Sequence, residues 1–579
     1  MKKFLSLLLA LAILTASMLT LASCGEPENE GAHVSVYLGD PIYDFDPSDY
    51  YVDNNAAQLM SLLYEPLFTL DEKGELVNAA AKKYEVNEEE RLIEITLRET
   101  YWSDGTRVTA DDFLYAWRNL LLEPGKANPA AALLYDIENA LEVKRGTLSS
   151  SELGIEANLY DLKIYYRDGA DYEQLLKNLA AVECSPVRQD ATIAASSYWA
   201  KSASTIYTNG PFALSTLDYD EGLIILERNL GYHQSPQKTD YDNNVAPHSL
   251  VSFFTMDGHT VDVEYKDIGN TVFYMGDASI ADRKTYGAAA TLTDTLSTYS
   301  YVFNTENPLF ADKNVRYALS IAIDRQAIID EIVFGKAATG LLSSKANAGV
   351  EQELLSKNSK LAEARDLLAS VDFGSLEKAF TLTVNNDEQS RKIADLVAAT
   401  WRQLGFDVTV KNATYVKSAQ EDFSTNSTVE FYDSELQYIV KEASFGNREF
   451  DVIGIDWALY SSDPFVALAS FTSDFNGNGA VFKDATTTYR SNISGWTSES
   501  YDALVSAAYN AEDEASRNDK LKSAEALLIS EAPIAPIVFN QNFAIVDETL
   551  SGCEIDGFGY FVFTNLAQKD YELYLPKEN

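Results

Sequence analysis

Cysteine and histidine are scarce in this sequence of 579 residues. There are three cysteines and four histidines. The cysteines Cys184 and Cys553 lie far apart, and with the third one, Cys24, accounted for below, no disulfide framework is indicated. The histidines form no HExxH or HxxxH pattern, so the spacing predicts no metal site. They are His33, His233, His248 and His259.

Positive charge is also in short supply. Lysine and arginine total 45 against 88 aspartates and glutamates, which gives a net charge of −43. A surface this acidic repels phosphate backbones, so nucleic acid is excluded as a partner. It also argues against a face that binds anionic lipid. In an exported protein, acidity of this kind favours solubility more than it indicates a specific cationic ligand.

Catalytic motifs are missing as well. No GxSxG elbow and no P-loop lysine motif occurs. The GNG at 477–479 lacks the third glycine of a dinucleotide fingerprint, and DYDEG at 218–222 lacks the closing glutamate of a calcium loop. Paired carboxylates carry no information in so acidic a chain. We therefore expect no enzyme activity.

The N-terminus does carry a clear pattern. Lys2 and Lys3 precede an apolar run that ends in small residues, which is typical of a secretory signal and approaches the length of a membrane span. Leu21-Ala22-Ser23-Cys24 resembles the lipobox of bacterial lipoproteins, in which the chain is cut before a cysteine that then carries lipid. The alternative is an ordinary cysteine that follows a signal peptide. EPENEG at 25–30 is polar and indicates a flexible tether.

The rest of the chain has the composition of a globular protein. It is 46% hydrophobic and 12% aromatic, and 579 residues are enough for two or three lobes. No second apolar run approaches the length of a membrane span. The clearest unit is a strand at 380–384, a helix at 388–404 that stops at Gly405, and a strand at 406–410. This order predicts a parallel pair with a right-handed crossover, and hence an α/β fold.

Several other elements are expected from their patterns. Thr109 and Asp112 form a near capping box that opens a helix through Leu121. The remaining expected elements are an extended segment at 34–39, a helix at 56–67, a turn at 71–75, strands at 92–99 and 223–229, and a helix from Val315 to Phe334 capped by Gly335.

A series of longer segments then resembles one family. They include LYEPLFTLDEKGELVNAAAKKYEV (63–86), ITLRETYWSDGTRVTADDFLYAWRNLL (95–121), TNGPFAL (208–214), NPLFADKNVRYALSIAIDRQAI (307–328), FDVIGIDWALYSSDPFVAL (450–468) and AEALLISEAPIAPI (524–537). In this order they are similar to the extracytoplasmic solute-binding proteins of peptide ABC transporters, the oligopeptide- and dipeptide-binding family known as solute-binding protein family 5. The similarity covers most of residues 35–570, and residues 247–280 and 421–447 fit it less well.

The resemblance implies a two-lobed periplasmic-binding-protein-like fold of type II, from the large peptide-binding cluster, with an extra subdomain on the N-terminal lobe. The lobes would close over a ligand by a hinge. The expected divisions are 1–23 for the signal peptide, 24–33 for the lipidated tether, 34–64 for the first part of lobe I, 65–184 for its extra subdomain, 185–302 for its second part, 303–545 for lobe II, and 546–579 for the return to lobe I.

The family binds peptides as an added strand. The resemblance places that contact on Asp456, Trp457 and Ala458, with Leu459, Tyr460 and Asp463 following. It also adds two groups of cleft residues. These are Tyr50, Tyr51 and Asp53 after DPSD, and Tyr299, Tyr301 and Asn304 in TYSYVFN. Each tyrosine, and Trp457, has packing in the core as its alternative.

One position departs from the family. Many members carry an aspartate three residues after the cleft tryptophan, where it pairs with the ligand's amino group. Tyr460 occupies that position here. Either Asp456 or Asp53 supplies the charge, or a shifted loop brings Asp463 to the same place, or the amine is not the anchor. We favour the last of these.

The resemblance implies a membrane-anchored, substrate-binding component of an ABC importer. Its partners would be a peptide ligand, the permease subunits and, through lipid on Cys24, the bacterial cell membrane, on whose outer or periplasmic face the protein would lie. No cofactor is implied, and a monomer is expected. The alternatives are the same fold binding a non-peptide solute, or a peptide sensor or signalling receptor.

Overall fold

The computed structural model describes residues 31–39, 42–49, 54–195, 198–233, 244–254, 273–275, 279–422, 427–473, 475 and 492–571. Within these ranges, no helix is both long enough and apolar enough to cross a membrane. Cys24, the expected signal peptide and most of the expected tether lie outside them.

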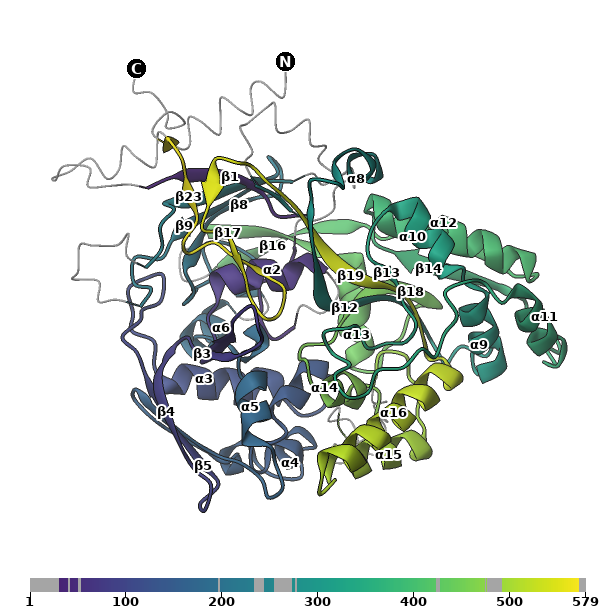
Figure 1. Ribbon diagram of the computed structural model, residues 1–579, viewed down its shortest axis with the longest axis horizontal. Coiled ribbons are helices and arrows are strands. Elements are labelled where there is room, and N and C mark those ends of the chain that lie inside the picture. Colours follow the sequence, from purple (N-terminus) through teal and green to yellow (C-terminus); the bar gives the residue numbers. More distant parts are fainter. Residues whose placement is uncertain are drawn as a thin grey trace.

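In the described part of the chain, one mixed sheet of eleven strands runs through the molecule (Figure 1). Its order is β15-β14-β18-β12-β19-β11-β1-β10-β9-β8, with β13 paired to β19. The strands are β1 (His33–Tyr37), β8 (Phe212–Asp218), β9 (Leu223–Arg228), β10 (Ser249–Phe253), β11 (Phe273–Met275), β12 (Thr291–Phe303), β13 (Lys336–Ala337), β14 (Ala379–Val384), β15 (Asp407–Asn412), β18 (Val452–Ala458) and β19 (Ile534–Val546).

Five smaller sheets accompany it among the described residues. The largest has the order β4-β5-β7-β6. Its strands are β4 (Ala81–Asn87), β5 (Leu92–Leu97), β6 (Ile155–Asn158) and β7 (Asp161–Tyr165). The two-stranded sheets are β2 (Phe68–Leu70) with β3 (Leu76–Asn78), β16 (Tyr415–Asp422) with β17 (Ser427–Ser434), β20 (Leu550–Ser551) with β23 (Ala567–Gln568), and β21 (Glu554–Ile555) with β22 (Phe561–Val562).

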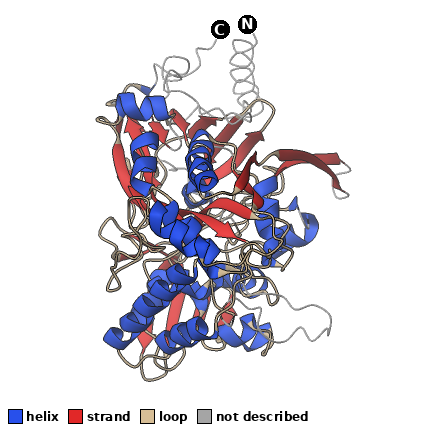
Figure 2. Ribbon diagram, turned by 90° about the vertical axis from the view of Figure 1, so that its right-hand side faces the viewer, coloured by secondary structure: helices blue, strands red, loops and turns tan. Residues whose placement is uncertain are grey.

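Helices lie against the strands in both the upper and the lower part of the molecule (Figure 2). They are α2 (Asn54–Leu63), α3 (Ala110–Ala116), η1 (Trp117–Leu121), η2 (Pro129–Leu134), α4 (Ala140–Lys144), η3 (Ser150–Glu152), α5 (Tyr172–Asn178), η4 (Val182–Cys184), α6 (Gln189–Ala195), α8 (Ile280–Tyr286), α9 (Lys313–Ala322), α10 (Arg325–Ile332), α11 (Leu361–Ala369), α12 (Glu388–Gln403), α13 (Glu435–Ser444), α14 (Pro464–Ala469), α15 (Glu499–Tyr509) and α16 (Glu514–Glu531).

The strand–helix–strand unit is confirmed. β14 and β15 are parallel neighbours, and α12 connects them. Asp387 caps α12 by accepting the Ser390 N–H at 2.7 Å, and Gly405 ends it with a φ of +90°. The capping box is also confirmed, since the Asp112 carboxylate accepts the Thr109 N–H at 2.9 Å.

The prediction of one helix from Val315 to Phe334 is wrong. Two helices, α9 and α10, cover this stretch, and the chain leaves the helical conformation at Ile323. Asp324 then starts α10, because its carboxylate accepts the Ala327 N–H at 3.0 Å. An aspartate inside an apolar pattern competes for backbone N–H groups in this way, and the apolar periodicity alone does not reveal it.

The two longest strands, β12 and β19, join the two halves of the sheet. Each has 13 residues, and they pair antiparallel. The register of this pair shifts between Asp294 and Thr298. Next to the shift, the Asn540 amide donates to Ser297 Oγ at 2.9 Å and to Asp456 Oδ1 at 2.5 Å. Such an irregularity weakens the ladder locally, shortly before the expected boundary between the lobes after residue 302. The expected lobe boundaries themselves stay a prediction.

The largest apolar core crosses those boundaries. It combines Trp117 and Leu133 from the 65–184 segment with Val466, Tyr501 and Leu528 of α14, α15 and α16. A second core lies around α9, α10 and α12, and a third around β1, α2, β9 and β10. The expected extra subdomain therefore shares buried surface with the C-terminal helices.

Candidate functional site

Of the residues expected to bind ligand, Tyr50, Tyr51 and Asp53 lie outside the described part of the chain, as does Cys24. The other nine are described. They are Tyr299, Tyr301, Asn304, Asp456, Trp457, Ala458, Leu459, Tyr460 and Asp463.

The ladder between β12 and β18 divides these residues between the two faces of the sheet. Tyr299 lies opposite Asp456, and Thr298 lies opposite Trp457. Directly opposed residues point to the same face, and successive residues alternate. Tyr299 and Tyr301 thus point to one face, and Trp457 points to the other. The structure does not gather them into one wall.

Tyr299 and Tyr301 are core residues here. They are 2% and 0% exposed and belong to the apolar core around α12, where the Tyr301 ring lies 5.7 Å from that of Trp401. Burial raises the pKa of both phenols well above the usual value. Both hydroxyls therefore stay neutral.

Asn304 has a structural role at the end of β12. Its amide donates to the carbonyls of Arg448 and Phe450 at 3.1 and 2.8 Å. These bonds hold the segment that leads into β18. Asn304 also lines a polar cavity of about 910 Å³ between α13 and the starts of β14 and β18, away from Trp457.

Trp457 lies on the face of the sheet occupied by the largest core. It is 3% exposed, and its ring stacks on Phe471 at 4.7 Å. In the described part of the chain, its indole N–H is buried without a hydrogen-bond acceptor. A buried donor without an acceptor is costly and rare in folded proteins. This N–H is therefore a group that a bound ligand could satisfy.

The backbone of β18 offers an edge beyond β14. β14 pairs with β18 only at Val452 and Ile453, whereas β12 pairs with it as far as Ala458. The Leu459 N–H bonds to Leu296 O, and alternate residues of an antiparallel strand bond to the same side. The N–H and C=O of Ala458 therefore point away from β12. Within the described residues, no strand pairs with β18 on that side after Ile453.

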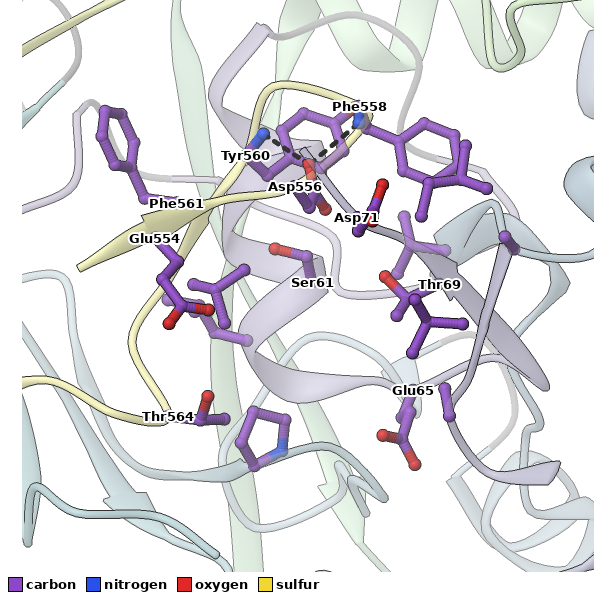
Figure 3. Close-up of a pocket in the computed structure, with 18 of the residues that line it drawn as sticks. Ser61, Glu65, Thr69, Asp71, Glu554, Asp556, Phe558, Tyr560, Phe561 and Thr564 are labelled. Atoms are coloured by element: carbon purple, nitrogen blue, oxygen red, sulfur yellow. Dashed lines mark hydrogen bonds between the residues drawn. The ribbon is translucent and has the colours of Figure 1, made fainter. Parts of the chain in front are cut away.

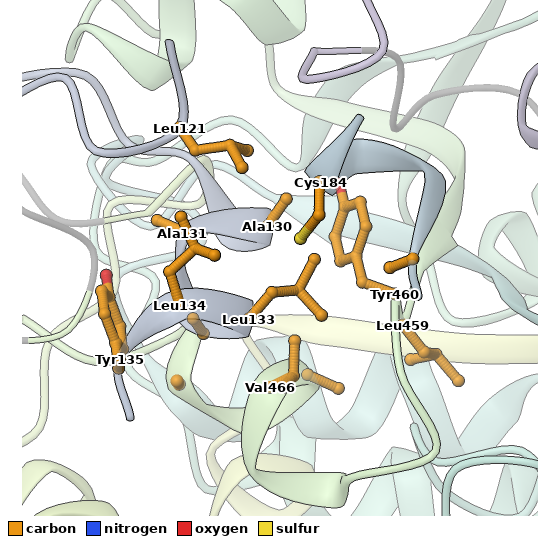
Figure 4. Close-up of a cluster of buried hydrophobic side chains, with 14 of the residues drawn as sticks. Leu121, Ala130, Ala131, Leu133, Leu134, Tyr135, Cys184, Leu459, Tyr460 and Val466 are labelled. Atoms are coloured by element: carbon orange, nitrogen blue, oxygen red, sulfur yellow. The ribbon is translucent and has the colours of Figure 1, made fainter. Parts of the chain in front are cut away.

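The segment after β18 packs against the 65–184 segment. Leu459 and Tyr460 are 0% and 5% exposed, and they lie in an apolar cluster with Leu133, Cys184 and Val466 (Figure 4). Tyr460 adopts a φ of +62°, which is uncommon outside glycine. An apolar environment of this kind does not supply a negative charge for a ligand's amine.

The carboxylate of Asp463 already has hydrogen-bond and ion-pair partners within the protein. Its carboxylate caps α14 through the Phe465 N–H at 3.0 Å. Both of its oxygens also lie 2.8 Å from Nη2 of Arg517. The Asp463 carboxylate is therefore already paired, and the alternative of a shifted loop stays a prediction.

The sequence reasoning did not single out the loop at 42–49, which precedes the expected tyrosines. Asp49 forms an ion pair with Lys126 at 2.6 Å, and Asp44 forms one with Lys201 at 3.2 Å. Burial, together with Asp49 and Asp44, raises the pKa of Asp46 to about 6. The run DFDPSD was the available signal, since three aspartates within six residues have to find partners.

A second cavity, of about 860 Å³, lies at the C-terminal end of α2. Among the described residues, no three histidine, cysteine, aspartate or glutamate side chains are grouped as a metal would require.

Comparisons with known proteins identify the family. The model of the bacterial extracellular solute-binding proteins, family 5 Middle, matches residues 75–479. The periplasmic murein peptide-binding protein MppA of Escherichia coli is 27% identical over 522 residues, which is 86% of each chain. The periplasmic oligopeptide-binding protein OppA of Salmonella typhimurium is 26% identical over 534 residues, covering 86% of this chain and 89% of the relative.

Solved structures show the same fold. The murein tripeptide binding protein MppA of Escherichia coli has a TM-score of 0.73 at 23% identity, and Listeria monocytogenes OppA bound to peptide has 0.75 at 19%. Each comparison covers 93% of this chain and 99% of the other. The expected two-lobed α/β fold is confirmed. The chain belongs to the bacterial extracellular solute-binding proteins of family 5.

Proposed function

We propose that this chain is the substrate-binding component of an ABC importer and that it captures peptides against the edge of β18. The observation that carries the proposal is the end of the β14–β18 pairing at Ile453, which leaves the Ala458 backbone directed away from β12. A peptide in extended conformation bonds to such an edge through its own backbone. Family membership agrees, and so do the names of the relatives, which include murein peptide- and oligopeptide-binding proteins.

Backbone pairing explains how such a site accepts many sequences. Main-chain bonds supply affinity without reading side chains, and the buried Trp457 N–H adds one directional donor. Tyr50, Tyr51 and Asp53 stay proposed contacts from the N-terminal lobe. Asp456 and Ala458 stay on the proposed list as strand residues. The placements of Tyr299, Tyr301, Asn304 and Asp463 favour supporting roles.

We also propose that the chain acts outside the cytoplasm, bound to the membrane by lipid on Cys24. The support is the LASC sequence after an apolar run and the extracellular family. A tether raises the local concentration of the binding protein near its permease. Labelling with a palmitate analogue is expected to mark the natural protein and not Cys24→Ala. Equal labelling of both would remove the anchor from the proposal.

The central experiment is calorimetry with peptides identified by native mass spectrometry of the purified protein. Ala458→Pro removes the N–H that points away from β12 without removing a bond to β12. Trp457→Phe keeps the ring on Phe471 and removes the indole N–H. We expect Trp457→Phe to weaken peptide binding by about tenfold, the value of one good hydrogen bond, and Ala458→Pro to weaken it at least as much.

The control is Tyr438→Phe on the exposed side of α13, which is expected to leave binding unchanged. Melting temperatures show whether each variant is folded. If folded Ala458→Pro and Trp457→Phe both bind peptide as the natural protein does, the site is not at β18. If only non-peptide solutes co-purify and bind, the alternative of a non-peptide carrier replaces the proposal.

A further inference from the structure

The cavity at the C-terminal end of α2 uses none of the residues proposed to hold peptide. It has a volume of about 860 Å³, which is within the range of small-molecule sites. Most of its lining comes from the end of α2 with the β2–β3 hairpin and from the segment 553–564 around β21 and β22 (Figure 3). Ala180, Val182, Pro211, Tyr232 and His233 complete the lining. Neither β18 nor the segment at 459–463 reaches it.

One wall of the cavity is aromatic and apolar. The rings of Phe558 and Tyr560 stack with centroids 6.1 Å apart and an interplanar angle of 13°. Phe561, Leu62 and Leu70 extend this wall. Faces of aromatic rings attract cations as well as apolar groups.

Five carboxylates line the same cavity: Glu65, Asp71, Glu72, Glu554 and Asp556. Two of them are held in place by the backbone. Asp71 Oδ1 accepts the N–H groups of Lys73 and Glu75, each at 2.9 Å, and Asp556 Oδ1 accepts those of Phe558 and Tyr560 at 3.0 and 2.8 Å. In both cases the second oxygen, Oδ2, takes no part in these bonds.

These two carboxylates belong to adjoining segments. The Gly557 N–H donates to Leu70 O at 3.0 Å, which joins the turn of Asp556 to the strand before Asp71. Figure 3 shows Asp71 and Asp556 at the same end of the cavity. Within the described chain, neither forms an ion pair with lysine, arginine or histidine. Lys345, near the same turn, donates to Gly557 O at 2.9 Å.

At the opposite end of the cavity, the carboxylate of Glu65 has hydrogen-bonding partners. Glu65 accepts from Tyr232 Oη and pairs with His233 Nε2, both at 2.7 Å. Arg98 in turn lies 3.3 Å from His233 Nδ1. Asp71 and Asp556, at the end with the aromatic rings, thus form no ion pair within the described residues, and Lys345 acts on Asp556 only as a nearby charge.

We propose that this cavity is a second ligand site, which takes a small organic cation: an ammonium or guanidinium group on an apolar or aromatic chain. The charged group would bind the open oxygens of Asp71 and Asp556 by charge-assisted hydrogen bonds. The chain would lie against Phe558, Tyr560 and Leu70. A bare metal ion fits less well, since the described residues include no group of three metal-ligating side chains.

The test uses 2-phenylethylammonium as the probe and 2-phenylethanol as its neutral counterpart, by calorimetry at about pH 8, where Asp556 is ionised, and at about 0.15 M salt. Salt at this level screens diffuse attraction to an acidic surface. We expect the ammonium to bind with one-to-one stoichiometry and the alcohol to bind at least tenfold more weakly. The double variant Asp71→Asn, Asp556→Asn is expected to lose at least tenfold in affinity for the ammonium.

The matched control is Glu85→Gln, Glu94→Gln, which removes two carboxylates that face each other across β4 and β5, away from the cavity. It is expected to bind the probe as the natural protein does, and so are Trp457→Phe and Ala458→Pro. Equal loss in the control pair would show that only overall charge attracts the probe. Competition between probe and peptide, or no saturable binding at all, would also overturn the second site. Since peptide capture at β18 is measured separately, either result can fail without the other.

Discussion

Lys201 and Asp433 form an ion pair with 2.8 Å between Nζ and Oδ1. Lys201 follows α6, whereas Asp433 lies near the end of β17, which comes after β12 in the chain. The β16–β17 hairpin, which carries Asp433, makes further contacts with the N-terminal part of the molecule. Asp220 contacts Lys417 Nζ at 2.9 Å and Tyr432 Oη at 2.6 Å. The β16–β17 hairpin therefore connects the two halves of the sheet, and its second strand lies in one of the two stretches that fit the family resemblance less well.

Removing this connection should favour an open arrangement of the lobes. The double variant Asp220→Asn, Asp433→Asn loses two partly exposed ion pairs, each worth about 0.2–1 kcal/mol. We expect a larger radius of gyration without ligand by small-angle scattering, and peptide affinity lower by about two- to fivefold, because less of the protein is closed. Glu85→Gln, which loses one exposed ion pair within β4, is the control. Identical scattering and affinity in all three proteins would mean that the hairpin does not hold the lobes.

Asp463 and Arg517 should matter for stability. The Asp463 side chain is 2% exposed, and its ion pair with Arg517 uses both oxygens. Asp463→Asn keeps an oxygen to cap α14 but leaves Arg517 without its counter-charge. We expect the free energy of unfolding in urea to fall by about 2–3 kcal/mol. Glu531→Gln, which removes the exposed pair with Lys313, is expected to change it by less than about 0.5 kcal/mol. If both variants lowered the free energy of unfolding equally, the buried ion pair would stabilise the fold no more than the exposed one.

Asp556 should make stability depend on pH. Burial raises its pKa to about 7, despite the opposing effects of the Tyr560 N–H and of Lys345. The folded state then holds a proton between about pH 4 and 7 that the unfolded state has lost. Stability from this group is therefore present below pH 4 and is lost as pH rises to about 7, with a slope of up to about 1.4 kcal/mol per pH unit.

The measurement compares the natural protein with Asp556→Asn by urea unfolding at several pH values. The variant should gain stability relative to the natural protein between pH 4 and 7, and the difference should be constant above pH 8. Asp168→Asn, at a side chain that is 93% exposed, controls for the loss of one charge. Parallel pH profiles for the natural protein and Asp556→Asn would show that Asp556 has an ordinary pKa.

Local patterns predicted much of the fold. The β14–α12–β15 unit and the helix start at Thr109 were readable because caps, glycines and apolar periodicity agree at these places. The break at Asp324 was not readable, since one side-chain hydrogen bond ended an otherwise continuous apolar face. The 65–184 segment packs on α14, α15 and α16 through contacts between residues hundreds of positions apart, and no local pattern reports these.

The candidate site was less predictable than the fold. Resemblance named β18 and Trp457, and the structure gives both a feature that a ligand can use. It also named Tyr299 and Tyr301, but the pairing of β12 with β18 turns these rings toward α12. Which face a strand residue occupies depends on register with a distant partner, and a single sequence does not contain that information. The acidic cavity near Asp556 was missed because its two halves come from residues 61–79 and 553–564.

The last prediction concerns the amino group of the peptide. Tyr460 stands where many family members have an aspartate, and it lies in an apolar cluster with Leu133 and Cys184. Asp463 is already bound to Arg517. The segment after Trp457 therefore offers the ammonium no carboxylate that lacks a cation. A charge-assisted hydrogen bond is about twice as strong as a neutral one, so its absence should be visible in affinity.

We expect a free peptide and its N-acetylated form to differ by less than about tenfold in calorimetry, or ~1.4 kcal/mol. If acetylation lowered the affinity more than about a hundredfold, another carboxylate would have to bind the ammonium group of the peptide. Asp53→Asn and Asp456→Asn would then identify which one, since only the variant without the true partner would bind both peptides alike.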